Sequence, residues 1–317
     1  MTTAAFNSAA LVLPSPVLVT GGAGFIGSHL VEALVSLGSE VRVLDNLSSG
    51  SLANLSSVSS KIDFYVGDIL DAALVEKLSR GARCVFHLAA LSSIPMSRSA
   101  PQACLSVNGQ GTLNVMGAAA KLGAKKLVYS SSSAVYGDLE APHAETMAPR
   151  PNTPYAAVKL LGEHMGLFYR GSSSLATVSL RYFNVYGPRQ SADGADAGVV
   201  PVFVKALAEG RAPVIYGDGR QTRDFIHVKD VVRANLLAAA APDVGDGVFN
   251  VATGVEASVL EVLEALSQGK EGAPKPLFEP PRPGDPCRSR GSAAKAADIL
   301  GFKAQIALAE GLKSLSQ

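Results

Sequence analysis

The chain predicts a doubly wound α/β fold: a parallel sheet with helices on both faces, followed by a smaller C-terminal α/β lobe. Two observations carry this prediction. Short apolar segments alternate with longer amphipathic segments through the first half of the chain, which is typical of parallel strands covered by helices. After about residue 183, Gly, Pro and polar residues become denser, which indicates a second structural unit.

Each expected element has its own signal. The strands are short apolar runs bounded by turn residues, and the helices repeat apolar residues at helical spacing. The first helix stops before Gly38, a residue that commonly ends helices. We expect strands at 17–19, 40–44, 62–66, 84–88, 126–130, 177–182 and 248–251, and helices at 25–37, 107–122, 155–169 and 231–240.

The same pattern suggests how the chain is divided. Residues 16–183 are expected to form the sheet domain, to which 231–252 return. Residues 184–230 and 253–317 are expected to form the smaller lobe. Residues 1–15 contain no Lys or Arg, unlike a signal peptide, and are expected to be a loose tail.

Composition excludes several classes of protein. The 28 Lys and Arg nearly balance the 27 Asp and Glu, whereas a nucleic-acid binder needs a basic face. The three Cys, with no CxxC spacing, argue against a disulfide scaffold or a cysteine zinc site. No apolar run approaches the roughly 20 residues that span a membrane. We therefore expect a cytoplasmic protein with no nucleic-acid or membrane partner and no metal, since His87 and His227 lack ligand spacing.

A glycine pattern follows the first strand and opens the first helix. Gly21 permits a tight turn, Gly24 lets the backbone approach a pyrophosphate, and Gly27 lets the helix pack closely on the strand. The helix N-terminus offers free N–H groups to an anion. Glycines in an ordinary turn are the alternative, but the strand–turn–helix context indicates a Rossmann-type dinucleotide site.

Two acidic residues extend this site. Asp45 ends the second strand 18 residues after Gly27, where a carboxylate accepts both ribose hydroxyls and repels a 2′-phosphate. This favours NAD over NADP, and Arg42 on the same strand is expected to point elsewhere. Asp68, after the third strand, is placed to meet the adenine edge; the alternative is that it caps a helix.

Tyr155 and Lys159 lie four residues apart on one face of a predicted helix. A phenol with a pKa of about 10 is a poor base at neutral pH. A nearby ammonium and a nicotinamide's positive charge are expected to lower that pKa. Such pairs are common on solvated helices, but this one follows a serine run, 130–133, at the end of a strand, where a hydroxyl could relay a proton.

These motifs together resemble the extended short-chain dehydrogenase/reductases, an NAD-dependent epimerase/dehydratase family, and within them the UDP-glucose and UDP-N-acetylglucosamine 4-epimerases. The resemblance spans essentially the whole chain. Besides the glycine motif and the Tyr155/Lys159 pair, it rests on the stretches 87–90, 130–137, 181–189, 223–228 and 282–285. The NAD contacts it implies are Gly21, Gly24, Phe25, Ile26, Gly27, Asp45, Asn46, Asp68, Ile69, Leu88, Ala89, Ala90, Tyr155 and Lys159.

The resemblance also implies a sugar-nucleotide site. Ser132 would be the catalytic hydroxyl beside Tyr155 and Lys159. Arg223 and Arg282 would clamp the diphosphate, which suits guanidinium geometry, although a surface ion pair is the alternative. Val199 and Val200 replace an Asn-Leu pair of some members, which puts uracil contacts there in doubt. The implied substrate-binding residues are Ser92, Ser93, Ser131, Ser132, Ser133, Asn184, Val200, Tyr216, Arg223, Arg282, Asp285 and Ser289.

The resemblance implies a reaction at C4 of the sugar. Related dehydratases carry an acidic pair after the catalytic hydroxyl, and related decarboxylases often carry a Glu there; this chain has Ser133 and Ala134. The remaining chemistry is epimerisation: Tyr155 takes the 4-OH proton, NAD takes the C4 hydride, the 4-keto sugar rotates, and hydride returns to the other face. NAD is regenerated and is expected to stay bound.

Ser289 bears on the substrate, because the family position it matches borders the 2-substituent of the sugar. A small residue there admits an N-acetyl group, unless Ser289 is merely a loop residue. We expect UDP-N-acetylglucosamine or UDP-glucose. UDP-glucuronate is the competitor, because the serine run and Arg189 could hold its carboxylate; another nucleotide-sugar oxidoreductase and a non-catalytic NAD sensor are further alternatives. As in relatives, segments 107–122 and 155–169 could pair as a four-helix homodimer contact.

Overall fold

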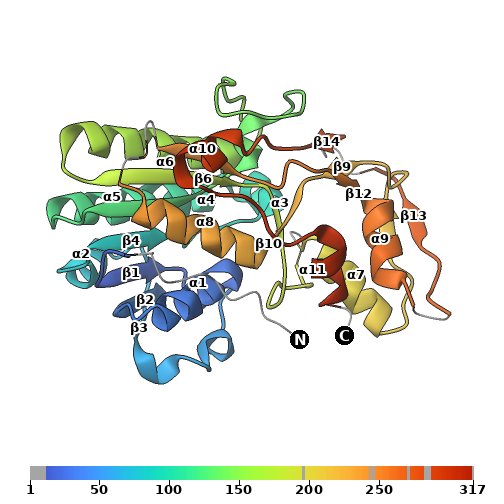
Figure 1. Cartoon of the computed structure of the whole chain (residues 1–317), viewed down its shortest axis with the longest axis horizontal. Helices are drawn as coiled ribbons and strands as arrows, with labels where there is room; N and C mark the ends of the chain where they lie inside the picture. The colour runs from blue at the N-terminus through green and yellow to red at the C-terminus, as the bar shows by residue number, and fades with distance from the viewer. Residues whose placement is uncertain are drawn as a thin grey trace.

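The computed structural model describes residues 12–194, 197–242, 244, 247–269, 272–281 and 287–315. Its central feature is a seven-stranded parallel sheet (Figure 1). The strands are β1 (Val17–Thr20), β2 (Val41–Asp45), β3 (Ile62–Val66), β4 (Cys84–His87), β5 (Lys126–Ser132), β6 (Ala176–Tyr182) and β11 (Val248–Val251). Their spatial order is β11-β6-β5-β4-β1-β2-β3. The order reverses between β1 and β4, the switch point at which such sheets bind ligands. The predicted fold class is confirmed.

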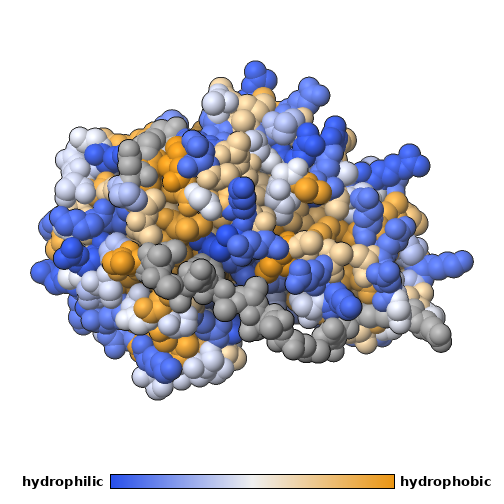
Figure 2. Space-filling model, viewed as in Figure 1, coloured by the Kyte–Doolittle hydropathy of each residue, from blue (hydrophilic) through white to orange (hydrophobic). Residues whose placement is uncertain are grey.

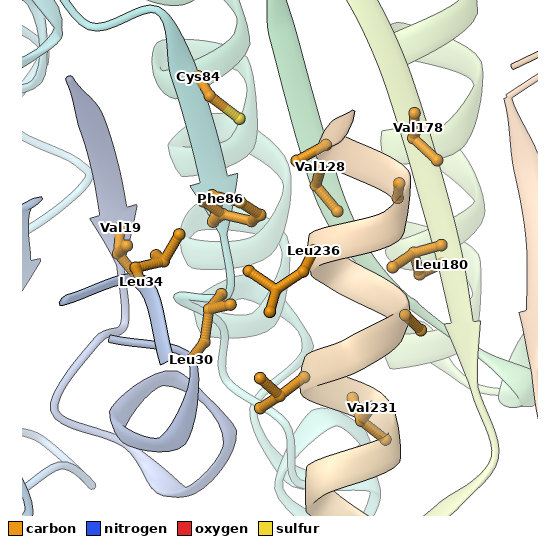
Figure 3. Close-up of a cluster of buried hydrophobic side chains, with 14 of the residues drawn as sticks. Val19, Leu30, Leu34, Cys84, Phe86, Val128, Val178, Leu180, Val231 and Leu236 are labelled. Atoms are coloured by element: carbon orange, nitrogen blue, oxygen red, sulfur yellow. The ribbon is translucent and has the colours of Figure 1, made fainter. Parts of the chain in front are cut away.

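Helices cover both faces of the sheet because parallel strands expose apolar side chains on both sides. On one face lie α1 (Phe25–Ser36), α8 (Val228–Ala240) and α10 (Ala294–Leu300). Their side chains meet those of the strands in one buried cluster, in which Leu34 lies near Val19 and Leu236 near Val128 (Figure 3). The other face carries α2 (Ala72–Ser79), α5 (Thr112–Lys121) and α6 (Pro154–Ser172).

One predicted helix has an irregular beginning. The helix expected at 107–122 follows a short helix, α4 (Pro101–Cys104). It begins within a π-helical turn over Leu105–Gly111 and becomes regular in α5. Asn108 in that turn accepts a bond from the Leu91 N–H at 2.7 Å and donates to the Leu91 carbonyl at 2.8 Å. The turn thus braces the loop after β4, and π-helical turns of this kind are frequent at functional sites.

The smaller lobe lies beside the sheet, at the right of Figure 1. Its elements are α7 (Val199–Ala208), β8 (Val214–Tyr216), β9 (Thr222–Arg223), β12 (Ala257–Ser258), α9 (Val259–Ser267), β13 (Leu277–Glu279), β14 (Arg288–Ser289) and α11 (Leu308–Lys313). Two further strands, β7 (Asn184–Tyr186) and β10 (Phe225–His227), pair with each other between the sheet and this lobe. Phe203, Ile215 and Val262 are among the buried residues of a separate apolar core there.

Polar and apolar residues are interspersed over the face seen in Figure 2. No described helix has both the length and the apolar character needed to cross a membrane.

Candidate functional site

The glycine loop between β1 and α1 is built as the pattern predicts. Gly21 has a positive φ of +72°, and a Cβ on it would lie 2.6 Å from the Ala89 nitrogen. A Cβ on Gly27 would lie 2.0 Å from the Gly21 carbonyl oxygen, so only glycine lets the helix approach the turn. A Cβ on Gly24 would have just this same oxygen within 4 Å, at 3.3 Å. The loop therefore presents uncovered backbone at Gly24.

This loop has the character of a phosphate cradle. Gly24 caps α1 without a side-chain hydrogen bond, so the N–H groups of Phe25, Ile26 and Gly27 point out of the first turn. Leu88, Ala89 and Ala90 follow β4 and lie alongside, where the Leu88 N–H donates to the Thr20 carbonyl at 3.0 Å. A pyrophosphate at Gly24 would receive both the N–H groups and the positive end of the helix dipole.

Asp45, the predicted ribose contact, ends β2 beside the glycine loop. Its carboxylate accepts bonds from the Ala23 N–H at 2.9 Å and the Leu47 N–H at 2.8 Å. These bonds fix the carboxylate beside the loop. Arg42 is directed away from it, as expected, since its guanidinium donates to the carbonyls of Leu78 and Arg80.

The structure corrects the helix-cap alternative for Asp68 and refines the cofactor contact predicted for Ile69. Asp68 does not cap α2: that role belongs to Asp71, which accepts from the Leu74 N–H. Asp68 instead accepts a bond from the Asn46 amide at 2.8 Å. Ile69, also predicted to contact the cofactor, packs its side chain against Gly111 and is 4% exposed, and its carbonyl accepts the Asn114 amide at 3.0 Å. Its backbone N–H is the group that a contact with the cofactor would use.

The three predicted catalytic residues lie together. Ser132 ends β5, and Tyr155 and Lys159 lie in the first turns of α6. Thr153 caps α6 by accepting the Ala156 N–H at 3.1 Å, which sets where the helix begins. The Lys159 Nζ lies 5.8 Å from the centroid of the Tyr155 ring and donates to the Ser130 carbonyl at 2.6 Å. The Ser132 hydroxyl hydrogen-bonds with Tyr155.

The ionisation of this trio differs from the sequence prediction. Burial raises the pKa of Tyr155 to about 12, and the hydrogen bond from Ser132 offsets only part of this rise. The prediction that Lys159 lowers the pKa of Tyr155 is therefore wrong for the side chains of the protein alone. The Lys159 ammonium is instead turned to the Ser130 carbonyl. Burial lowers the pKa of Lys159 to about 8, so it remains mostly charged at pH 7. The charge of a nicotinamide, which the prediction also invoked, is the remaining source of lowering.

The serines fall into two groups. Ser133 is half-buried beside Ser132, and Ser92 is exposed after β4. The Ser131 hydroxyl donates to the buried Glu163 carboxylate of α6 at 2.5 Å. Ser93 is 5% exposed and caps α3 (Ile94–Ser99) by accepting the Met96 N–H. The Ser131 and Ser93 hydroxyls are therefore both used inside the fold, and substrate contacts of these two residues remain predictions.

The predicted sugar-nucleotide residues of the C-terminal half that the structure describes lie on short elements outside the large sheet. Asn184 and Val200 line a small cleft together with Phe225. Arg223 and Ser289 are paired partners on the parallel strands β9 and β14, so their side chains share a face. Tyr216 ends β8 and is 37% exposed. Arg282 and Asp285 lie outside the described residues.

Several polar residues that were not among the predicted site residues support the site. Glu163 follows Lys159 by one helical turn and forms a buried bidentate ion pair with Arg181, at 2.9 and 2.7 Å. His87 bridges the hydroxyls of Thr20 and Thr112. Burial lowers the pKa of His87 to about 3, so it is neutral. Of these contacts, only those of Glu163 had a signal in the sequence, which is its four-residue spacing from Lys159.

Arg189 is placed differently from the prediction that it could hold a substrate carboxylate. Its guanidinium donates to Glu32 of α1 at 2.6 Å and to the Ser28 hydroxyl at 3.2 Å. On the same helix, His29 bonds to the Pro188 carbonyl at 3.0 Å. Arg189 therefore ties the turn after β7 to the nucleotide helix.

Gly24→Ala should separate cofactor binding from folding. The added methyl group has a single neighbour at 3.3 Å in the protein but occupies the space over the uncovered backbone. We expect the NAD content of the purified protein to fall at least about tenfold, or about 1.4 kcal/mol of binding free energy, with little change in melting temperature. Gly171→Ala, in open space on α6, is the matched control. Full NAD content in the Gly24 variant would show that the cofactor does not approach this loop.

The chain is similar to known proteins of one family. A model of the NAD dependent epimerase/dehydratase family matches residues 17–252. The chain is 45% identical over 301 residues to a UDP-glucose 4-epimerase of Mycolicibacterium smegmatis, covering 93% of this chain and 95% of that protein.

Solved structures of related proteins superpose on nearly the whole chain. A UDP-N-acetylglucosamine 4-epimerase from Methanobrevibacter ruminantium, in complex with UDP-N-acetylmuramic acid, superposes with a TM-score of 0.90 at 38% identity, over 95% of this chain and 98% of that one. A UDP-glucose 4-epimerase of Thermus thermophilus in complex with NAD gives a TM-score of 0.86 at 40% identity, over 94% and 96%.

Proposed function

Because the chain belongs to the NAD dependent epimerase/dehydratase family and uses NAD, we propose that it is a UDP-hexose 4-epimerase. The observation that carries this proposal is that Tyr155, Lys159 and Ser132 lie together at the carboxyl end of β5, in the same sheet whose strand β1 leads into the glycine loop. In the smaller lobe, β9 and β14 pair Arg223 with Ser289. The relatives described above act on, or bind, UDP-sugars.

The proposed mechanism assigns proton transfer to the protein. When bound, NAD supplies the hydride acceptor and donor at C4 of the sugar. Tyr155 takes the proton from the 4-hydroxyl and later returns it to the C4 oxygen of the rotated sugar, while Ser132 holds the sugar oxygen and relays the proton. Lys159, fixed by the Ser130 carbonyl, would hold the nicotinamide ribose, and the positive charge that bound NAD supplies would favour the phenolate. The 4-keto sugar turns about its diphosphate link between the two hydride transfers.

The residues that follow Ser132 argue against the family's other reactions. Dehydration needs an acid and a base beyond the catalytic hydroxyl, and Ser133 and Ala134 supply neither. Arg189, paired with Glu32, is turned away from a substrate carboxylate, which weakens the case for UDP-glucuronate. Reversible epimerisation is the reaction that this set of groups can complete.

We propose that the substrates are UDP-N-acetylglucosamine and UDP-N-acetylgalactosamine, UDP-glucose and UDP-galactose, or both pairs. Ser289 supports the N-acetylated pair, because it is small and shares its face of the sheet with Arg223, the proposed diphosphate contact. The similarity to a UDP-N-acetylglucosamine 4-epimerase supports the same assignment.

Ser289→Tyr should change the choice of substrate. The larger ring would fill the space that an N-acetyl group needs, so we expect turnover of UDP-N-acetylglucosamine to fall roughly 100-fold while UDP-glucose is still used. Ser289→Ala, which keeps the space, is the matched control and should accept both. Equal activity of the Tyr variant on both sugars would show that Ser289 does not border the sugar.

We propose that the chain forms a homodimer through α5 and α6. Three exposed apolar residues support this: Leu161 and Phe168 on α6, and Leu105 on the π-helical turn before α5. An apolar area of this kind is typical of an association surface. Light scattering should give twice the mass of the chain, and Phe168→Glu should shift it to the monomer.

Proton NMR of the purified protein with UDP-N-acetylglucosamine, UDP-glucose or UDP-glucuronate, with no NAD added, tests the proposed function. We expect the signals of the C4 epimer to appear with at least one of the first two sugars. No change with any of the three, even after NAD is added, would overturn the proposal.

A further inference from the structure

Asp224 is a fully buried carboxylate that the proposed mechanism does not use. It lies between β9 and β10 and is 0% exposed. Its oxygens accept four hydrogen bonds: from the Thr253 N–H at 2.8 Å and hydroxyl at 2.6 Å, the Gly254 N–H at 2.9 Å, and the Gly291 N–H at 3.1 Å. Burying a charge costs a great deal unless such donors surround it, so this arrangement is a built feature of the fold.

The four donors belong to two loops that are far apart in sequence. Thr253 and Gly254 follow β11, the last strand of the large sheet, whereas Gly291 follows β14 of the smaller lobe. Gly291 is also pressed against the sheet domain, since a Cβ on it would lie 2.6 Å from Ala252 Cβ and from the Phe183 ring. Asp224 therefore joins the two parts of the molecule at a single point.

The proposed substrate residues stand directly beside this point. Arg223 precedes Asp224 and pairs in register with Ser289, which lies two residues before Gly291. On the other edge of β9, Arg223 pairs with Ala257, three residues beyond Gly254. The hydrogen bonds of Asp224 thus hold the backbone on both sides of the strand that carries Arg223.

We propose that Asp224 is a positioning residue, which fixes Arg223 and Ser289 side by side so that they meet the diphosphate and the sugar of the bound nucleotide. This inference rests on the proposed function for the roles of those two residues. It concerns binding and not proton or hydride transfer, because Asp224 is itself enclosed by backbone donors and does not reach the substrate.

Asp224→Asn tests the proposal, since the amide keeps the shape but turns an N–H₂ group toward N–H donors. We expect the Kd for UDP, measured by calorimetry, and the KM for the UDP-sugar to rise at least about tenfold, or about 1.4 kcal/mol. We expect kcat and NAD content to change less than about threefold, about 0.65 kcal/mol on the same scale. Thr253→Ala removes one donor, the Thr253 hydroxyl, and should raise the Kd for UDP by a smaller factor. It replaces the Asn variant as the test if that variant does not fold.

Asp230→Asn is the matched control. Asp230 is also buried, at 2% exposed, and accepts bonds from the Gln305 and Ile306 N–H groups and from Arg233, away from Arg223. We expect it to lower the melting temperature without raising the Kd for UDP. An unchanged Kd in folded Asp224→Asn, or an equal rise in both variants, would overturn the proposal. Wild-type protein that binds UDP without epimerising any sugar would overturn the proposed function alone, whereas failure to bind UDP would overturn both.

Discussion

Replacing Tyr155 with Phe should lower kcat by roughly 10²- to 10⁴-fold, the range that general acid–base catalysis contributes. The substitution removes one hydroxyl and keeps the ring, which is 9% exposed and packs with Cys104 and Val158. No other side chain takes over the proton, because Lys159 is held by the Ser130 carbonyl. Initial rates from NMR or a coupled assay, together with the NAD content, measure the effect.

The matched control is Tyr169→Phe, the same change on the same helix but away from the glycine loop. It should leave kcat within about twofold of the wild type, about 0.4 kcal/mol. Near-normal turnover by folded, NAD-loaded Tyr155→Phe would remove Tyr155 from its proposed role. A melting temperature lowered only in the Tyr155 variant would assign it a structural role instead.

Arg181→Met should lower the free energy of unfolding by about 3–5 kcal/mol, the cost of leaving a buried charge without its partner. The side chains of Arg181 and Glu163 are 5% and 3% exposed, and the pair joins β6 to the helix that carries Tyr155 and Lys159. The guanidinium also donates to the Tyr136 hydroxyl at 2.9 Å. Urea denaturation followed by circular dichroism measures the change.

Two further variants sharpen this second prediction. Lys121→Met breaks an exposed ion pair with Glu76 on the surface and should cost about 0–1 kcal/mol. Glu163→Met combined with Arg181→Met removes both charges and should recover much of the lost stability. A loss in Arg181→Met no larger than that in Lys121→Met would contradict the importance of the buried pair.

The sheet and the glycine loop could be predicted because their signals are local. The strand at 62–66 was predicted to the residue, since turn residues bound its apolar run. The steric roles of Gly21 and Gly27 also follow from a spacing of a few residues. Local patterns of this kind depend on backbone geometry, which the neighbouring residues largely determine.

The polar connections could not be predicted because they join distant parts of the chain. The bond between Asp224 and Gly291 spans 67 residues, and that between Tyr136 and Asn250 spans 114. The shift in the pKa of Tyr155 has the same origin, since the depth of burial depends on how β5 and α6 pack. The run of four serines likewise does not itself tell which hydroxyl finds a partner such as Glu163.

The most direct test of the central claim follows the hydrogen at C4 of the sugar. UDP-N-acetylglucosamine or UDP-glucose carrying deuterium at C4 is incubated with the purified protein, with no NAD added, and the epimer is analysed by NMR and mass spectrometry. If the hydride leaves and returns within one site, the product keeps deuterium at C4. A product with a solvent-derived proton at C4 would contradict the account, because it would require proton abstraction from carbon instead of hydride transfer.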